Sequence, residues 1–327
     1  MKTTGRLIGW EAAHLLVTYA LQIYRRKLNM ILKHIYKKQG IKLNYFEIRN
    51  NLQPLVLIHA QGVDAVSFEN VWGHLSKQYH IYSVDCYGHG ESLHNATQYN
   101  VEDIGKAINC FIEDVVKEKV YLLGHSSGGL IAAYIASKTE LCKYLILEDT
   151  PFFSSQGERR KGSFNYIDLS TICHNFINQS ESKDFVLYYF SNQYAWNLFP
   201  ERSKEKIKEK MIAMASKYRN KHPDRNLKVL FWPKAALSAF QGMNKYDPMF
   251  GETFYNDSFH NGIPHEDILK NIKCKTIFMK AQTNISEDDL KRVSELVADL
   301  QIVRFDCGHG IHMEKPKEFI ECLSKLG

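Results

Sequence analysis

Apolar runs alternate with segments of helical periodicity over the first half of the chain. Buried parallel strands appear as continuous apolar runs, whereas helices repeat their apolar positions about every 3.6 residues. The predicted strands are 42–49, 54–60, 80–85, a run that starts at 120, and 143–149, and the predicted helices are 67–77, 101–118 and one that starts near 130. This order predicts an α/β protein with a mostly parallel sheet and helices on both faces.

The alternation stops near residue 150 and resumes near residue 271. The later elements are strand 276–281, helix 287–298, strand 301–306 and a closing helix 316–326. Residues 150–270 are rich in aromatic side chains and include a Lys-rich helical segment at 201–228. An insertion at this point covers the carboxyl edge of the sheet, where open α/β sheets hold their sites. We therefore predict a helical cap or lid at 150–270 on a core formed by 42–149 and 271–327.

Residues 1–41 are predicted to form an N-terminal helical extension. Glu11 and His14 interrupt its apolar run and no small-residue cleavage site follows, so neither a signal peptide nor a membrane span is expected. Docking on the domain is the expected role of the extension, and contact with a membrane interface is the alternative. Apolar residues recur in it at helical spacing, with basic residues between them: Leu15, Leu16, Tyr19, Ile23, Ile31, Leu32 and Ile35.

Composition excludes some functional classes. The net charge of +6 is spread over several segments, without a basic tail or a Cys/His finger, so nucleic acid is not an expected partner. The 7 cysteines are an odd number and are widely spaced, without a C-x-x-C pair. They are typical of reduced thiols in a cytoplasmic protein. The oligomeric state is left open.

Residues 120–129 read V-Y-L-L-G-H-S-S-G-G and carry the strongest chemical signal. An apolar strand runs into a Gly-rich turn, and a helical pattern follows at once. This is the context of a nucleophile elbow, in which Ser126 sits on a strained strand-to-helix turn with Gly124 and Gly128 on either side. The alternative is an ordinary Gly–Ser turn between two elements.

Three further motifs occur in a fixed order with the elbow. They are a turn at 59–62 (H-A-Q-G), the sequence D-x-x-G-H-G-x-S at 85–92, and a Gly–His turn at 308–309 before the last helix. With these motifs the chain resembles the α/β-hydrolase superfamily over about residues 45–327. The resemblance implies an α/β-hydrolase fold with a cap and no cofactor.

The resemblance also implies roles for individual residues. Ser126 matches the nucleophile and His309 the general base. The backbone N–H groups of Gln61 and Ser127 match the oxyanion hole. Residues 88–90 match a structural turn, to which no chemistry is assigned.

The chain departs from the family pattern at two positions. Ala60 stands where the oxyanion turn has glycine, which costs little only if its φ is negative. Asn284 stands where the acid of the triad is expected after the penultimate strand. Asp149, at the end of the strand after the elbow helix, is the preferred acid, and Asp288 and Asp289 are the alternatives.

The expected activity is hydrolysis of an ester, thioester or related acyl bond of a small, largely apolar substrate through an acyl-Ser126 intermediate. A non-catalytic ligand-binding member and an acyltransferase are the alternatives. Serine at the elbow argues against the epoxide hydrolases and dehalogenases, which need a carboxylate nucleophile. His309 and His312 could form a metal pair, but the sequence suggests no third ligand, so no metal is expected.

Overall fold

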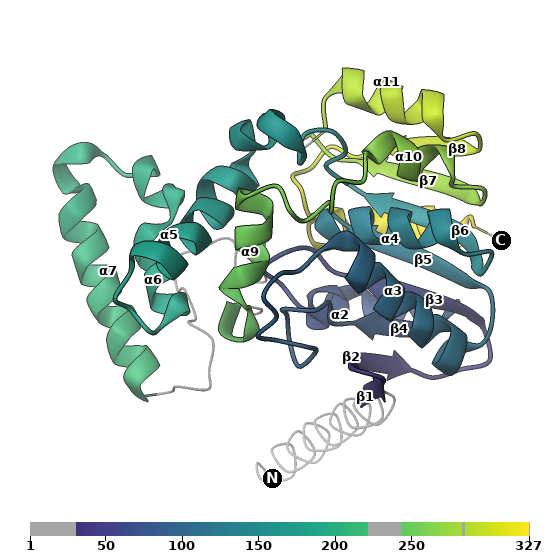
Figure 1. Cartoon of the computed structure of the whole chain (residues 1–327), viewed down its shortest axis with the longest axis horizontal. Helices are drawn as coiled ribbons and strands as arrows, with labels where there is room; N and C mark the ends of the chain where they lie inside the picture. The colour runs from purple at the N-terminus through teal and green to yellow at the C-terminus, as the bar shows by residue number, and fades with distance from the viewer. Residues whose placement is uncertain (1–30, 222–242, 283–284, 327) are drawn as a thin grey trace, which may run out of the picture.

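A computed structural model describes residues 31–221, 243–282 and 285–326 (Figure 1). Within them an eight-stranded sheet has the order β1-β2-β4-β3-β5-β6-β7-β8. The strands are β1 (Ile31–Lys38), β2 (Ile41–Ile48), β3 (Gln53–Ile58), β4 (Tyr79–Val84), β5 (Val120–His125), β6 (Cys142–Glu148), β7 (Lys275–Lys280) and β8 (Leu300–Arg304).

The sheet is mostly parallel, as the sequence predicts. Strands β3 to β8 are parallel to one another, whereas β2 is antiparallel to both β1 and β4. The predicted fold class is confirmed. The boundaries of the buried strands lie within about two residues of their predicted positions, because a continuous apolar run ends where a parallel strand leaves the core.

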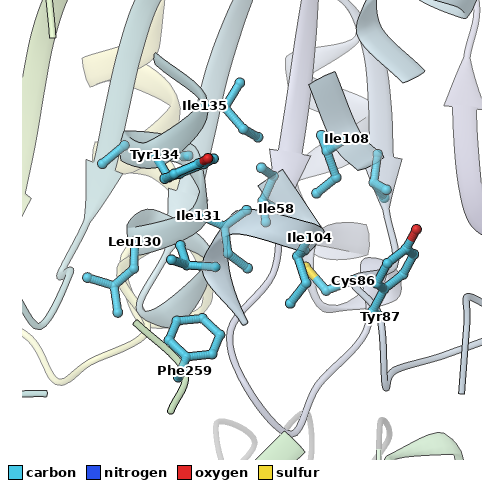
Figure 2. Packing of buried hydrophobic residues seen from close by; sticks show 14 of the residues in the cluster. Ile58, Cys86, Tyr87, Ile104, Ile108, Leu130, Ile131, Tyr134, Ile135 and Phe259 are labelled. Atoms are coloured by element: carbon cyan, nitrogen blue, oxygen red, sulfur yellow. The ribbon is translucent and has the colours of Figure 1, made fainter. Parts of the chain in front are cut away.

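Helices cover both faces of the sheet and enclose two separate apolar clusters. One face carries α3 (Val101–Phe111), α4 (Ser127–Lys138) and α11 (Glu287–Leu296), and the other carries α2 (Glu69–Leu75), α12 (Ile311–Glu314) and α13 (Pro316–Ser324). Figure 2 shows side chains of α3, α4 and β3 meeting in the first cluster, with Ile104, Ile131 and Ile58 among them. Helix α4 is buried along most of its length, which holds the turn that precedes it firmly in place.

The insertion between β6 and β7 is helical in its described parts, residues 150–221 and 243–270. Its main helices are α5 (Thr171–Gln179), α6 (Phe185–Asn192), α7 (Glu201–Lys221), α9 (Pro248–Tyr255) and α10 (His265–Lys270). Figure 1 shows α5, α6 and α7 beyond the sheet, with α9 nearer to it. The Lys-rich segment is α7 as far as residue 221, and its last residues lie outside the described part. The cap boundaries at 150 and 270 remain a prediction.

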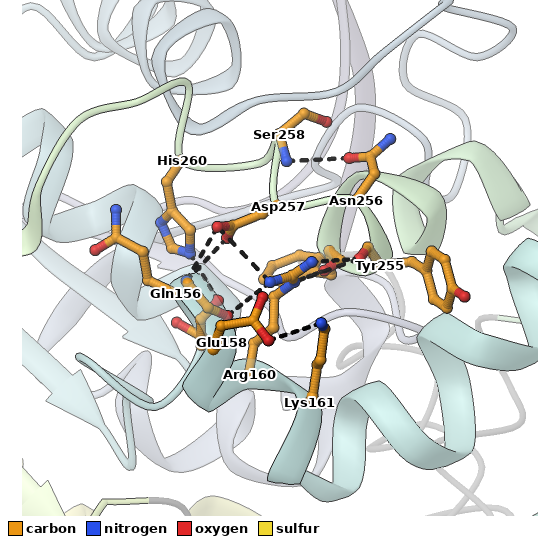
Figure 3. A network of polar contacts seen from close by, with 12 residues as sticks. Gln156, Glu158, Arg160, Lys161, Tyr255, Asn256, Asp257, Ser258 and His260 are labelled. Atoms are coloured by element: carbon orange, nitrogen blue, oxygen red, sulfur yellow. Dashed lines mark hydrogen bonds and ion pairs between the residues drawn. The ribbon is translucent and has the colours of Figure 1, made fainter.

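Arg160 joins the first segment of the cap to the end of α9 (Figure 3). Its Nε donates to the carbonyl of Phe254 at 3.0 Å, and its Nη2 donates to the carbonyl of Tyr255 at 2.8 Å. Its Nη1 donates to the carbonyl of Gly157 at 2.6 Å, and Asp257 supplies a carboxylate 3.8 Å away. A buried guanidinium with several acceptors and a nearby carboxylate fixes the two cap segments to each other.

The predicted helical extension at 1–41 is wrong for residues 31–41. Residues Ile31–Lys38 form β1, which pairs with β2 from Ile31↔Ile48 to Lys38↔Ile41. The strand alternates half-buried Leu32, His34 and Tyr36 with exposed positions, so the true period is two. Residues Gln39 and Gly40 both have positive φ, as a tight hairpin turn requires.

The remainder of that extension, residues 1–30, lies outside the described part of the structure. The predicted contact of this segment with the domain or a membrane therefore stays a prediction. Over the described residues, the structure contains no helix with the length and apolar character needed to span a membrane.

A chain of hydrogen bonds through two buried histidines links the start of the cap to its end. The Phe153 N–H donates to His265 Nδ1 at 2.8 Å, so the His265 proton lies on Nε2. This Nε2–H donates to His260 Nδ1 at 3.1 Å, and His260 Nε2–H donates to the Ser155 carbonyl at 3.1 Å. Both rings are therefore neutral. Burial lowers the pKa of His260 to about 4 and the pKa of His265 well below 6.5.

The free energy of unfolding should fall as the pH is lowered from about 6.5 towards 4. Below pH 6.5 the unfolded chain binds protons at both histidines, whereas the folded chain does not. The two neutral rings therefore make their full contribution to the free energy of unfolding only above pH 6.5. Each ring contributes a slope of up to about 1.4 kcal/mol per pH unit in this window. Urea unfolding of His260→Asn at pH 7 and pH 5 should show a smaller pH dependence than the wild type.

Replacement of the exposed His74 provides the control for this experiment. His74→Gln should leave the pH dependence of unfolding unchanged. An equal pH dependence in His260→Asn and wild type would contradict the assignment of a neutral, buried His260.

Candidate active site

Ser126 occupies a strained turn between β5 and α4. Its backbone has φ 55° and ψ −122°, a conformation that residues with a Cβ rarely adopt. The turn is tight because the elements around it touch: a Cβ on Gly124 would collide with the backbone of Gly128, and one on Gly128 would collide with the carbonyl oxygens of Ile58 and His59. These are the glycine roles that the elbow motif predicts.

His309 lies in the loop between β8 and α12, close to the end of β6. Its Nδ1 is 2.7 Å from Oδ2 of Asp149. The Asp149 side chain is fully buried, and its Oδ1 accepts the Ala281 N–H at 3.2 Å. The Asp149 backbone has φ 43°, and its N–H donates to the Met279 carbonyl at 2.9 Å. With Nδ1–H donating to the carboxylate, Nε2 is the ring nitrogen that can take up a proton.

The elbow and the loop of His309 lie next to each other. His125, the residue before Ser126, places its Nε2 3.0 Å from the His309 carbonyl oxygen. The two imidazole rings are 4.6 Å apart. The structure thus brings the segments of Ser126, Asp149 and His309 together at the carboxyl ends of the central strands.

The other candidate acids lie in the first turn of α11. Asp289 accepts two hydrogen bonds from Arg159, at 2.8 and 2.6 Å, and one from the Ser286 hydroxyl at 2.8 Å. Asp288 is exposed. Asn284 lies outside the described residues. The hydrogen bond to Asp149 therefore distinguishes this carboxylate from the two in α11.

The turn at 59–62 is held in place by two neutral histidines. His59 Nε2 accepts the Cys86 N–H at 2.9 Å, and His89 Nε2 accepts the Gly62 N–H at 3.1 Å. Burial lowers the pKa of both histidines. Ala60 is not among the residues with positive φ, so its Cβ adds no backbone strain. The departure from glycine at this position is structurally inexpensive.

The two predicted oxyanion donors, Gln61 and Ser127, are adjacent. The Gln61 N–H donates to the Ser127 hydroxyl at 2.8 Å, and Ser127 is the first residue of α4. The N–H groups at the start of a helix lack partners within the helix and form the positive end of its dipole. A developing anion would compete with the Ser127 hydroxyl for the Gln61 N–H.

The cap covers this turn through the side chain of Gln61. Its Nε2 donates to the Tyr246 hydroxyl at 2.7 Å, and its Oε1 accepts from Asn165 Nδ2 at 3.0 Å. Leu169 and Met243 lie against Gly62. Sequence analysis missed these contacts, because no motif marks the cap residues that meet the turn.

A surface cavity of about 530 Å³ lies at the amino ends of β5, β6 and β7, away from this site. Its lining includes Lys119, Lys138, Lys143 and Lys275. None of the candidate site residues lines it.

A protein-family model described as alpha/beta hydrolase fold matches residues 53–169. This range includes the elbow and the 59–62 turn. The chain has the α/β-hydrolase fold. The predicted resemblance to that superfamily is confirmed. The solved structure of an N-formylmaleamic acid deformylase from Pseudomonas putida has a similar fold. That structure has a TM-score of 0.63 and 18% identity, and the match covers 89% of this chain and 100% of the deformylase.

Two curated relatives of this chain are similar to it over part of their length. An (E)-2-((N-methylformamido)methylene)succinate hydrolase from Acinetobacter baylyi is 29% identical over 46% of this chain and 60% of the relative. A pimeloyl-(acyl-carrier protein) methyl ester esterase from Vibrio cholerae is 28% identical over 36% of this chain and 44% of the relative. The matched region therefore spans less than two thirds of either relative.

Proposed function

We propose that this α/β-hydrolase is a serine hydrolase that cleaves an ester, thioester or related acyl bond of a small, largely apolar substrate. The observation that carries the proposal is the 2.7 Å contact between His309 Nδ1 and the buried carboxylate of Asp149, beside the elbow that holds Ser126. A histidine oriented by a buried acid is the base that a serine nucleophile requires.

The geometry supports a two-step reaction. The Ser126 hydroxyl attacks the acyl carbon and gives its proton to His309 Nε2, while the Asp149 carboxylate stabilises the imidazolium. The N–H groups of Gln61 and Ser127 bind the oxyanion of the tetrahedral intermediate. His309 then protonates the leaving group, which leaves an acyl-serine. Water, deprotonated by His309, attacks this ester and regenerates the serine.

The names of the two curated relatives are consistent with this reaction class. One is named a hydrolase of a formamido-substituted succinate and the other a methyl ester esterase. We transfer to this chain only the common feature, hydrolysis at an acyl carbon. The structure of the acyl group stays open.

A non-catalytic, ligand-binding protein is the alternative, because Asn284 stands in place of the usual acid. The buried Asp149 carboxylate argues against this alternative, because it reaches His309 from another strand. Acyl transfer uses the same acyl-serine intermediate and differs only in the acceptor. Labelling of Ser126 by a fluorophosphonate probe, located by peptide mass spectrometry, tests for an activated serine. Absence of labelling would favour the alternative of a non-catalytic protein that binds a ligand.

The value of kcat/KM should rise from acetyl to medium-length acyl esters. Leu169, Met243 and Tyr246 of the cap are buried and lie over the 59–62 turn, where the acyl group must enter. Each buried methylene contributes up to about 0.8 kcal/mol, roughly a fourfold gain per carbon, until the pocket is full. Steady-state kinetics on a p-nitrophenyl ester series measures this. A flat or falling profile would mean that these side chains only form the core of the cap and do not bind the acyl group.

A cytoplasmic location remains a prediction. In its favour, all 7 cysteines are free thiols, including Cys142 and Cys274, whose sulfur atoms are 3.5 Å apart. Proteins of reducing compartments keep such thiols unpaired.

A further inference from the structure

A second set of polar side chains lies buried beside the proposed catalytic residues. His125 precedes Ser126, Glu148 precedes Asp149, and His312 follows His309 by three residues. Their exposed fractions are 3%, 0% and 0%. Each of the three catalytic segments therefore contributes one residue to a polar cluster that solvent does not reach. We call His125, Glu148 and His312 the buried cluster.

Hydrogen bonds of the buried cluster connect the three segments. Glu148 Oε1 accepts both the backbone N–H and the Nδ1–H of His312, each at 2.8 Å, which joins the end of β6 to the start of α12. The Glu148 backbone carbonyl accepts the Ser126 N–H at 2.8 Å. His125 Nε2–H donates to the His309 carbonyl at 3.0 Å. His125 and Glu148 also face each other in the β5–β6 register.

The charges fit this arrangement. Burial opposes ionisation of Glu148, but His312, through its attraction and its two hydrogen bonds to the carboxylate, outweighs it and holds the pKa of this carboxyl at about 2. Burial lowers the pKa of His125 to about 3, so its ring is neutral and donates through Nε2–H. A buried carboxylate persists only where hydrogen-bond donors surround it. Because His312 in α12 supplies these donors, the buried charge of Glu148 is stabilised only when α12 is in its correct place.

We propose that His125, Glu148 and His312 are positioning residues that fix the backbone on which Ser126, Asp149 and His309 approach one another. The proposal rests on the proposed hydrolase function. Catalysis of this kind requires the reacting groups to stay within a fraction of an ångström of the productive geometry. The three segments come from parts of the chain up to 184 residues apart, and the buried cluster links them through hydrogen bonds of defined direction.

A metal site is the competing interpretation of the same residues. Ligand atoms of His125, Glu148 and His312 all lie within 4.8 Å of one another. However, the carboxylate already accepts two N–H groups at hydrogen-bond distance, and a structural metal site typically has four ligands, whereas this group supplies three. The geometry favours a hydrogen-bonded cluster, and metal analysis of the purified protein tests the alternative.

Paired substitutions of His125 separate positioning from packing. Glutamine can place an amide N–H where His125 has Nε2–H, whereas leucine fills the space without a donor. We expect His125→Gln to keep most of the kcat and His125→Leu to lose about tenfold to a hundredfold, with KM within about twofold in both. Leucine gains apolar burial but removes the donor to the His309 carbonyl, so the thermal stabilities of the two variants should be similar although their kcat values differ. If activity and stability fall in the same order, the role is packing.

Glu148→Gln tests the carboxylate, with Asp289→Asn as the matched control. Asp289 is also a buried carboxylate held by hydrogen bonds, but it lies in α11 on Arg159. Glu148→Gln should slow fluorophosphonate labelling of Ser126 about tenfold to a hundredfold, and Asp289→Asn should not. Equal labelling rates in the two variants would overturn the proposal. Stoichiometric metal in the wild type that is lost in Glu148→Gln would replace it with a metal site.

Hydrogen exchange gives a readout that does not depend on activity. The Ser126 N–H is protected by the Glu148 carbonyl, so a peptide covering residues 124–128 should exchange faster in Glu148→Gln than in Asp289→Asn. If the wild-type protein is not labelled at Ser126, the hydrolase function fails, and this exchange experiment still decides whether the buried cluster fixes the elbow. Unchanged exchange would overturn the positioning role.

Discussion

Replacing Ser126 with alanine should lower kcat/KM for short p-nitrophenyl esters by about 10⁴-fold or more. The substitution removes the nucleophile, and the remaining rate comes from substrate binding and the oxyanion donors alone. The fold should persist, because Ser126 is only half-buried and α4, which follows it, is held by apolar packing. Steady-state kinetics with a circular dichroism melt of both proteins measures the two effects.

Ser137→Ala, in the helix that follows Ser126, is the control for loss of a serine hydroxyl. Ser137 Oγ donates to the Tyr134 carbonyl at 2.7 Å, near the far end of α4. Its removal should leave kcat/KM within about twofold of the wild type, as is usual for a substitution remote from the reacting groups. If the wild type shows no turnover above Ser126→Ala on a broad acyl panel, the hydrolase proposal fails and a ligand-binding role takes its place.

The core of the fold could be predicted from sequence because its signals are local. Strands such as 54–60 and 143–149 are continuous apolar runs, and the order of strands and helices restricts the topology. The prediction of a helix at residues 31–41 is wrong because the spacing of Ile31, Leu32 and Ile35 fits the period of a helix as well as that of a strand. The missed signal was the glycine at position 40, a common turn residue, which with Gln39 separates the two strands that pair as a hairpin.

The site could be predicted only in part, because its remaining features depend on contacts between distant segments. The elbow and the Gly–His turn carry their own motifs. The sequence favours Asp149, at a strand end, over Asp288 and Asp289, but the contact of this carboxylate with His309 appears only in the folded chain. The buried cluster has no motif at all, and its members His312 and Glu148 lie 164 positions apart in the chain.

Asp149→Asn should lower kcat by about three to four orders of magnitude while the protein stays folded. Asparagine tolerates the positive φ at this position, and its carbonyl oxygen can still accept the Ala281 N–H. Its NH₂ group would then face His309 Nδ1 and donate to it, which places the ring proton on Nε2. In that tautomer the histidine cannot accept the Ser126 proton.

Asp288→Asn and Asp289→Asn are the controls that give this result its meaning. Both should retain nearly full kcat, because Asp288 is exposed and Asp289 is engaged by Arg159 and Ser286. The pH dependence of kcat/KM should also weaken in Asp149→Asn, since the remaining rate no longer depends on His309 acting as a base. An active Asp149→Asn together with an inactive Asp288 or Asp289 variant would place the acid in the segment after β7. Asp149 would then be a structural residue that holds the end of β7 through Ala281.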